Sequence, residues 1–234
     1  MGDWILATGD AKLANIETGK KVIFGDGKEW FWEDSIFKDN PRLAVEGQDG
    51  IWVHNYPGRR PYIKAEKNGR MIFMDSFRPD PGELFGLKKS EVARGKILVE
   101  TRTKKDFTHT VNKSFRYWDV LLKTDLPFIK VEDVETKDFR DALEILNGAT
   151  LFVGTDGALH HAAAALNVPA VVIWSGYSSP RHLGYEKQVN IHDGSEPCGT
   201  YARVCPHCKK KGEQIDVDLV IKTVRSEYAR LLRP

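Results

Sequence analysis

Apolar runs and amphipathic segments alternate along the second half of the chain. The apolar runs are short, and some contain no polar residue, which is typical of strands buried on both faces of a parallel sheet. The segments between them place apolar residues three and four positions apart, as surface helices do. The predicted strands are residues 96–101, 127–131, 151–153 and 170–174, and the predicted helices are residues 115–123, 137–146, 156–166 and 217–232. This order predicts an α/β fold with a parallel sheet covered on both faces.

The first part of the chain is less regular. It predicts a helix over residues 5–17, short strands over residues 21–24 and 51–53, and a basic loop over residues 55–69. Prolines and glycines gather between residues 77 and 96, which is typical of a domain boundary. We therefore expect an N-terminal domain over residues 1–95 and a C-terminal domain over residues 96–234.

The composition is that of a globular protein. Among 234 residues, 41% are hydrophobic and 29% are charged, and the mean hydropathy is −0.42. No apolar run approaches the roughly 18 residues that a membrane span needs, and the chain does not begin with a secretory signal, so we expect a cytoplasmic protein. The net charge is only +2, so any nucleic-acid or lipid partner must bind a local basic patch.

A polar turn, Gly154-Thr155-Asp156-Gly157, follows the apolar run at residues 151–153. Parallel sheets bind ligands at the carboxyl ends of their strands, and the free amides of a helix start attract anions. We expect Thr155 and Gly157 to bind a phosphate through amides and a hydroxyl. Asp156 either caps the helix or accepts a sugar hydroxyl, because its charge would repel phosphate. His160 follows one turn later on the same helix face as Asp156.

The run "LFVGTDGALHHAAAALNVPAVVIWSGYSSPRHLGY" resembles the signature of family 9 glycosyltransferases, the ADP-heptose:lipopolysaccharide heptosyltransferase group. Its strand, its D-x-G-x-x-H helix start, its Ala-rich helix and its later Gly and Ser-Pro positions come in the same order. Three further segments are similar to that group: "PCGTYARVCPHC", "NKSFRYWDVLL" and "GDWILATGDAK". The resemblance is dense from residue 137 onward and sparse before it.

The resemblance implies a GT-B architecture, in which two Rossmann-like domains with parallel sheets face each other across a cleft. The N-terminal domain is expected to be a reduced version, because no strand precedes Gly2-Asp3 in this chain. By matching, Asp3 falls on the catalytic aspartate and Lys113 on the lysine that binds the donor phosphate. Asp10 is a rival for the role of Asp3. The group's enzymes generally require no metal or other cofactor for catalysis.

Matching also places Thr155, Asp156, Gly157 and His160 on the donor-binding loop. The implied reaction moves a sugar from a nucleotide-diphospho-sugar donor to an acceptor hydroxyl.

The basic loop offers candidates for acceptor binding. Arg59 and Arg60 suit phosphate groups, and Tyr62, Tyr56 or Trp52 could stack on a sugar or a base. The acceptor is then a saccharide or lipid-linked glycan, or a hydroxymethylated base in DNA, which would have to be extruded or single-stranded. The alternative for this segment is a solvated loop whose tyrosines pack inward.

All three cysteines, Cys198, Cys205 and Cys208, fall in one short window. Their spacing suits a structural zinc site, with His192 or His207 as the fourth ligand. Reduced, packed cysteines are the alternative, and a redox role fits the surrounding pattern least well.

The sequence therefore predicts a glycosyltransferase. Two alternatives stay open: a noncatalytic nucleotide-sugar or nucleic-acid binding protein derived from such an enzyme, and a sugar-nucleotide epimerase.

Overall fold

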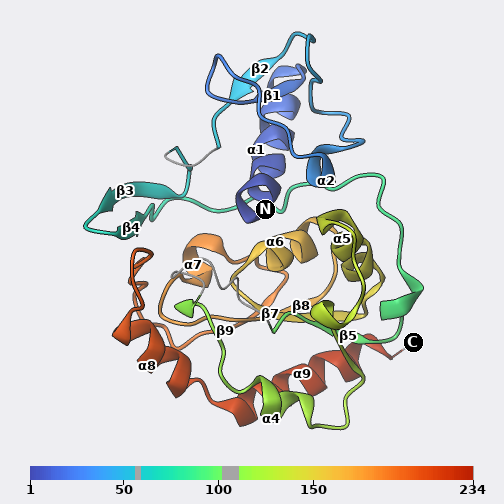
Figure 1. Cartoon of the computed structure of the whole chain (residues 1–234), viewed down its shortest axis with the longest axis vertical. Coiled ribbons are helices and arrows are strands. Elements are labelled where there is room, and N and C mark those ends of the chain that lie inside the picture. Colours follow the sequence, from blue (N-terminus) through green and yellow to red (C-terminus); the bar gives the residue numbers. More distant parts are fainter. Residues whose placement is uncertain (56–58, 102–110, 234) are drawn as a thin grey trace.

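A five-stranded parallel sheet forms the centre of the larger part of the molecule (Figure 1). The computed structural model describes residues 1–55, 59–101 and 111–233. The strands lie in the order β6-β5-β7-β8-β9, and all neighbouring pairs are parallel. Their bounds are Ile97–Val99 (β5), Phe128–Lys130 (β6), Leu151–Thr155 (β7), Ala170–Ile173 (β8) and Val189–Ile191 (β9). The predicted α/β class with a parallel sheet is confirmed.

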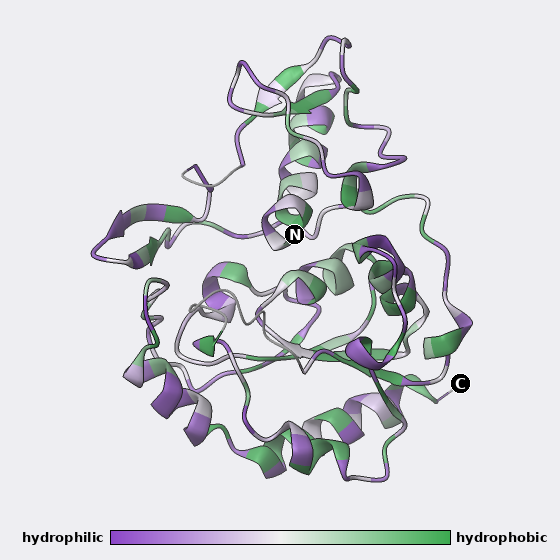
Figure 2. Ribbon diagram, in the orientation of Figure 1, coloured by the Kyte–Doolittle hydropathy of each residue, from purple (hydrophilic) through white to green (hydrophobic). Residues whose placement is uncertain are grey.

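Helices cover both faces of this sheet, because its strands are apolar on both sides. Successive residues of a strand point to opposite faces, so Phe152 and Val153 of β7 belong to two different hydrophobic clusters. On the Val153 side lie α4 (Trp118–Leu122) and α9 (Val217–Leu231). On the Phe152 side lie α5 (Phe139–Gly148) and α6 (Ala158–Ala165). Figure 2 shows mostly hydrophobic residues in β7 and β8 and mostly hydrophilic ones in α8 (Pro206–Gln214).

The N-terminal part has a smaller, two-stranded parallel sheet. Helix α1 (Gly2–Thr18) is followed by β1 (Val22–Phe24), which pairs in parallel with β2 (Ile51–Val53). The short helix α2 (Asp34–Phe37) lies between these strands in sequence. Among the described residues, no helix is long and apolar enough to cross a membrane.

The prediction of a loop over residues 55–69 is wrong for the second half of that range. Strands β3 (Ile63–Lys67) and β4 (Arg70–Phe73) form an antiparallel hairpin there. Its turn is Asn68-Gly69, with φ angles of 52° and 70°. Asn-Gly is the preferred pair for such turns because both central residues need positive φ. The dipeptide was therefore the sequence signal for this hairpin.

Several short elements were not predicted, because they carry little periodic apolar pattern. These are α2, β9, α7 (Pro180–Leu183), α8 and two 3₁₀ turns at Glu91–Ala93 and Val131–Asp133. The predicted start of the first helix was also wrong. Helix α1 begins at Gly2, so Asp3 lies in the first turn of a helix and not in a loop.

Helix α1 packs on α6, which joins the two parts of the chain (Figure 1). Small residues make this contact close. Ala7 and Ala11 of α1 and Ala162 of α6 are fully buried, and a side chain added at Gly2 would lie 3.6 Å from the Ala158 Cα. A single hydrophobic cluster consequently runs from Ile5 to Phe152 across both parts.

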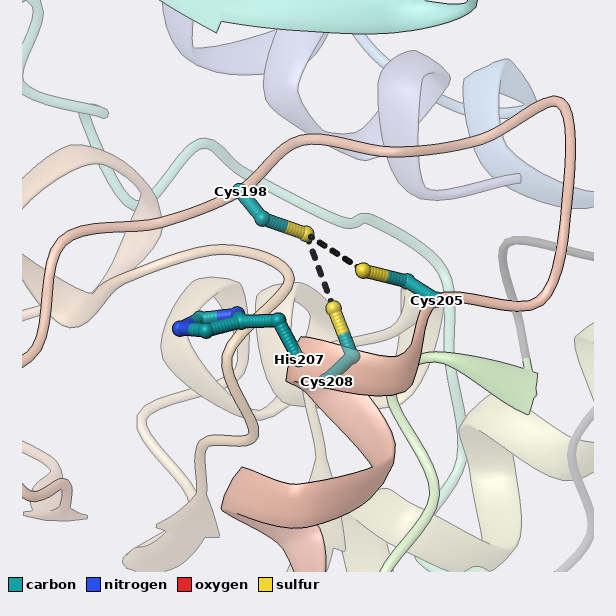
Figure 3. A group of neighbouring side chains, drawn as sticks. All are labelled: Cys198, Cys205, His207 and Cys208. Atoms are coloured by element: carbon teal, nitrogen blue, oxygen red, sulfur yellow. Dashed lines mark hydrogen bonds between the residues drawn. The ribbon is translucent and has the colours of Figure 1, made fainter.

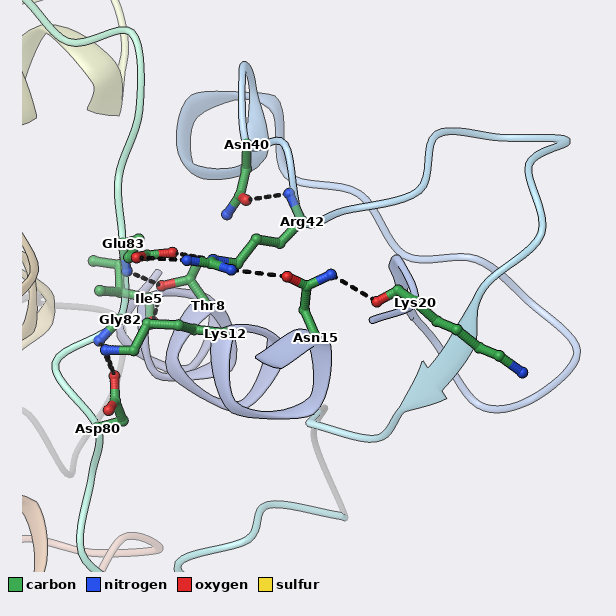
Figure 4. A network of polar contacts seen from close by, with 10 residues as sticks. All are labelled: Ile5, Thr8, Lys12, Asn15, Lys20, Asn40, Arg42, Asp80, Gly82 and Glu83. Carbon is green, nitrogen blue, oxygen red and sulfur yellow. Dashed lines mark hydrogen bonds and ion pairs between the residues drawn. The ribbon is translucent and has the colours of Figure 1, made fainter. Parts of the chain in front are cut away.

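Polar contacts fasten the segment after β4 to α1 (Figure 4). The buried Thr8 hydroxyl donates to the Ile5 carbonyl (2.7 Å) and accepts from the Glu83 amide (3.1 Å). Arg42 reaches both carboxylate oxygens of Glu83 at 2.5 and 3.2 Å, and Lys12 lies 2.6 Å from Asp80. These contacts fix the direction in which the chain leaves the N-terminal part.

Ala162→Leu should destabilise the protein by about 1–3 kcal/mol, because extra volume enters the close contact between α1 and α6. Urea denaturation measures this change. Ala229→Leu, on an exposed position of α9, is the matched control and should change stability by less than about 0.5 kcal/mol. Equal effects of the two substitutions would show that the α1–α6 contact tolerates larger side chains.

Candidate active site

The loop between β7 and α6 presents a buried, ionised carboxylate. Asp156 is 6% exposed and its Oδ2 lies 2.9 Å from the Lys113 Nζ. The Ser178 hydroxyl donates to the same oxygen. Burial alone would raise the pKa of Asp156, but Lys113, two neighbouring histidines and Ser178 together hold it below its usual range. The pair of Asp156 and Lys113 is therefore charged.

The backbone beside Lys113 is fixed by Asn112, which the sequence did not single out. The Asn112 side chain donates to the Thr200 carbonyl (2.7 Å) and accepts from the Cys205 amide (2.8 Å). Its own carbonyl accepts from the Ser175 hydroxyl (2.5 Å). Lys113 is thus held between the cysteine-containing loop and the end of β8.

His160 lies on the helix face predicted for it, but it is fully buried. The Gly157 amide donates to its Nδ1 (3.0 Å), and its Nε2 lies 3.1 Å from the Leu183 carbonyl. Its Nδ1 also lies 2.7 Å from the Gly157 carbonyl, so the imidazole contacts both backbone groups of Gly157 and ties the first turn of α6 to the loop before it. Burial lowers the pKa of His160 against the opposing effect of Asp156. A neutral imidazole follows.

His161 faces the N-terminal part, a position that the sequence pattern had not assigned to a site. Its Nδ1 lies 2.8 Å from the Tyr185 hydroxyl, and a side chain added at Gly2 would lie 3.4 Å from its Cδ2. Burial holds the pKa of His161 well below its usual value. His161 therefore lies neutral where α1 meets α6.

Asp156, His160 and His161 bring their potential ligand atoms within 4.8 Å of one another. All three groups already have protein partners. Asp156 pairs with Lys113, His160 Nδ1 contacts the Gly157 backbone, and His161 Nδ1 contacts the Tyr185 hydroxyl. An ammonium group 2.9 Å from the carboxylate also disfavours a metal cation there. The three residues form a polar network and not a metal site.

Asp3 meets two residues of the predicted acceptor loop. The Tyr62 hydroxyl donates to its Oδ1, and the Arg60 Nε lies 3.1 Å from its Oδ2. Arg59 is exposed and Tyr56 lies outside the described residues. The Asp3 side chain keeps 30% of its surface exposed, so its carboxylate can be approached.

Tyr177 links the Asp3 cluster to the Asp156 pair. The Lys113 Nζ lies 4.8 Å from the centre of its ring. Burial raises the pKa of Tyr177, the carboxylates of Asp156 and Asp3 add to this, and the Arg60 guanidinium opposes it. Its ring also lies 6.3 Å from the ring of Phe73, which packs on Tyr62. The structure brings together residues from α1, the segment before β3, Lys113 and the loops after β7 and β8.

Asp10, the rival of Asp3, lies two turns further along α1. The Asn55 side chain donates to it at 3.1 Å. Burial and the nearby Asp80 raise the pKa of Asp10 to about 6, although the Asn55 hydrogen bond opposes the shift. Arg60 and Tyr62 contact Asp3 instead, so Asp3 is the carboxylate of α1 that joins the site.

The three cysteines form a second cluster, beside α8 (Figure 3). The Cys198 Sγ lies 3.6 Å from the Cys205 Sγ and 2.8 Å from the Cys208 Sγ. His207 contributes a fourth potential ligand atom within 4.8 Å of the others, whereas His192 does not belong to this group. Three sulfurs and an imidazole suit zinc, whose sulfur ligands lie roughly 3.8 Å apart in a tetrahedral site with Zn–S bonds of about 2.3 Å.

Several solved structures are similar to the chain, including the following three. Iron-containing dodecameric glycosyltransferase TibC from enterotoxigenic E. coli H10407 is 14% identical with a TM-score of 0.47, covering 67% of this chain and 50% of that one. The structure of dodecameric iron-containing heptosyltransferase TibC in complex with ADP-D-β-D-heptose is 13% identical with a TM-score of 0.47, and the match covers 66% of this chain and 51% of that one. E. coli heptosyltransferase WaaC with ADP is 16% identical with a TM-score of 0.43, and the match covers 59% of this chain and 46% of that one. The chain thus spans about half the length of these proteins. No curated protein matches the chain.

Residues 135–213 match the sequence model of glycosyltransferase family 9 (heptosyltransferase). The matched range includes Asp156, its loop and the three cysteines, whereas Asp3 and Lys113 precede it. The match confirms the resemblance that the Asp156 loop and the Ala-rich helix suggested. Residues 135–213 are therefore similar to glycosyltransferase family 9.

Proposed function

We propose that the protein is a glycosyltransferase of the GT-B type that moves a sugar from a nucleotide-diphospho-sugar to an acceptor hydroxyl. The proposal depends on one observation above all. Tyr62, which donates to Asp3, packs on Phe73. The Phe73 ring lies 6.3 Å from the Tyr177 ring, and that ring faces Lys113 of the Lys113–Asp156 pair. A base for the acceptor and a cation for the leaving group therefore share one site. Residues 1–95 would form the acceptor-side domain and residues 96–234 the donor domain.

The donor would bind at the carboxyl end of β7. Lys113 supplies a positive charge that remains 18% exposed, and Thr155, Gly157 and the start of α6 lie beside it. Asp156 is ionised and fully paired, so its role is to hold Lys113 in place and to balance its charge when no donor is bound. His160 would stabilise the loop as a helix cap and would not contact the donor itself.

In the proposed reaction, the acceptor oxygen forms a bond with the anomeric carbon as the bond from that carbon to the diphosphate breaks. Asp3 accepts the proton of the acceptor hydroxyl and later releases it to water. Lys113 stabilises the negative charge that develops on the departing diphosphate. The ammonium group is preorganised for this because Asp156 and the Tyr177 ring fix it.

The acceptor is constrained less than the donor. Exposed Arg59 suits a phosphorylated saccharide or a lipid-linked glycan, and a hydroxymethylated DNA base is the less favoured choice because it must first leave the duplex. A cytoplasmic location is part of the proposal. Donor binding without any transfer would instead support the noncatalytic binding protein.

We also propose that Cys198, Cys205, Cys208 and His207 hold a structural metal of the zinc class. Such a metal would tie the loop at Cys198 to α8, and through Asn112 it would support the backbone beside Lys113. It would take no part in sugar transfer.

Asp3→Asn should lower the rate of transfer by about 10²–10⁴-fold, because the variant keeps the shape of the side chain but loses the base. Donor affinity should not change. Release of nucleoside diphosphate from a panel of nucleotide sugars, beginning with ADP-heptose, measures the rate. Asp10→Asn is the matched control on the same helix. If Asp3→Asn transfers at the wild-type rate, Asp3 is not the base.

Asp156→Asn should cost about 3–5 kcal/mol of stability, because it leaves the largely buried Lys113 charge without its partner. The double variant Asp156→Asn/Lys113→Met removes both charges and should recover part of that loss. Nucleotide binding should be weak in both variants, since neither holds a lysine in position. Urea denaturation and thermal shifts with nucleoside diphosphates measure the two effects. Unchanged nucleotide affinity in both would remove the pair from the donor site.

Metal removal should lower the melting temperature and release about one metal ion per chain. Elemental analysis should cover both zinc and iron, since the similar TibC structure is described as iron-containing. Cys205→Ser should show the same loss of stability with little change in the intrinsic rate of transfer. A protein purified without metal whose melting temperature is unaffected by added zinc or iron would show that the cysteines are simply packed thiols.

A further inference from the structure

Tyr62 is a buried tyrosine whose hydroxyl serves the Asp3 carboxylate. The residue is 7% exposed, and its ring lies 6.5 Å from the ring of Phe73 and 5.9 Å from that of Phe77. Its hydroxyl donates to the Asp3 Oδ1. Burial raises the pKa of Tyr62 well above its ordinary value, and the Asp3 carboxylate adds to this. The phenol therefore remains protonated and keeps donating at any physiological pH.

Arg60 holds the other oxygen of the same carboxylate. Its Nε lies 3.1 Å from the Asp3 Oδ2, and its side chain is only 18% exposed. The Arg60 contact is an ion pair without the geometry of a hydrogen bond, so Tyr62 supplies the directional contact that orients the carboxylate. A carboxylate has about four lone-pair positions, and the Asp3 side chain is 30% exposed, so there is room for an acceptor hydroxyl.

The hairpin that follows Tyr62 is itself anchored on the C-terminal part. The Met71 amide donates to the Gly199 carbonyl (2.8 Å), and the Arg70 Nε donates to the Cys198 carbonyl (2.8 Å). The Met74 amide returns to the Tyr62 carbonyl (2.9 Å). This docking fixes Tyr62 relative to the cysteine-containing loop, and so relative to Lys113. Asp3 is thereby oriented by residues tied to the donor side.

We propose that Tyr62, together with Arg60, is a positioning residue that orients the Asp3 carboxylate toward the acceptor. This inference rests on the proposed function. It gives Tyr62 and Arg60 a role different from the acceptor contact expected from the sequence. The tyrosine ring is covered by Phe73 and Phe77 and its hydroxyl is used by Asp3, so little of Tyr62 remains for a substrate.

The decisive variant is Tyr62→Phe, which keeps the ring in its packing and removes only the hydroxyl. Transfer kinetics should show kcat lowered by about 10–100-fold, because a catalytic group displaced by about 1 Å can lose that much. The KM values for donor and acceptor should stay within about twofold. Arg60→Lys should show a smaller loss of kcat than Arg60→Gln.

Tyr201→Phe is the matched control. Its hydroxyl also donates to a carboxylate, that of Glu66 at 3.1 Å, but this pair lies on the outer side of the hairpin and its loss should leave kcat unchanged. A double-mutant cycle that combines Tyr62→Phe with Asp3→Asn gives a second readout. In that background Tyr62→Phe should cause no further loss beyond about twofold, since there is no base left to orient.

The outcomes distinguish a failure of the positioning role of Tyr62 from a failure of the proposed function. Wild-type transfer that Asp3→Asn abolishes and Tyr62→Phe leaves intact would overturn the positioning role and leave the proposed function standing. A raised acceptor KM with unchanged kcat in Tyr62→Phe would also overturn it, in favour of acceptor binding. Wild-type protein that binds nucleotide sugars and transfers none would overturn the proposed function, and the positioning role with it.

Discussion

The contact between α1 and α6 joins the two parts of the molecule, and small residues form much of it. Gly2 lies against Ala158 and His161, and the buried alanines beyond them keep the two helices in close contact. A Cβ at Gly2 would make only ordinary contacts with His161 and Ala158, so the packing constraint lies at the buried alanines. Larger side chains there would disturb the placement of α1, and with it that of Asp3 in its first turn. The proposed chemistry therefore depends first on a packing constraint and only then on charge.

An ion pair then fixes the polar side chains near this contact. Asp156 is buried deeply enough that, unpaired, it would be costly, and Lys113 is the partner that offsets this cost. The lysine is fixed by Asn112 through the cysteine-containing loop, and the same loop carries the hairpin that leads back to Tyr62. One loop thus supports both Lys113, the proposed cation of the donor side, and Tyr62, which contacts the proposed base Asp3.

The sequence predicted the central sheet well, because its strands are apolar runs with helices between them. It also placed Asp156 and His160 at the end of β7, since a Gly-rich turn after a buried strand is a local pattern. It did not predict that the segment before β3 reaches Asp3, because contacts between segments some 60 residues apart leave no local signal. For the same reason Tyr177, Ser178 and Asn112 were missed, although each connects two parts of the site. The Asn-Gly hairpin turn, in contrast, was readable and was overlooked.

The central claim is that α1 and the loop after β7 form one site for a nucleotide-linked sugar. Hydrogen–deuterium exchange of the intact chain with and without saturating ADP-heptose tests this most directly. If the two segments form one site, ADP-heptose should slow exchange both in the peptides that cover α1 and in those that cover Thr155 to the start of α6. Slower exchange in the second set alone would contradict the claim, because the N-terminal part would then not share the site.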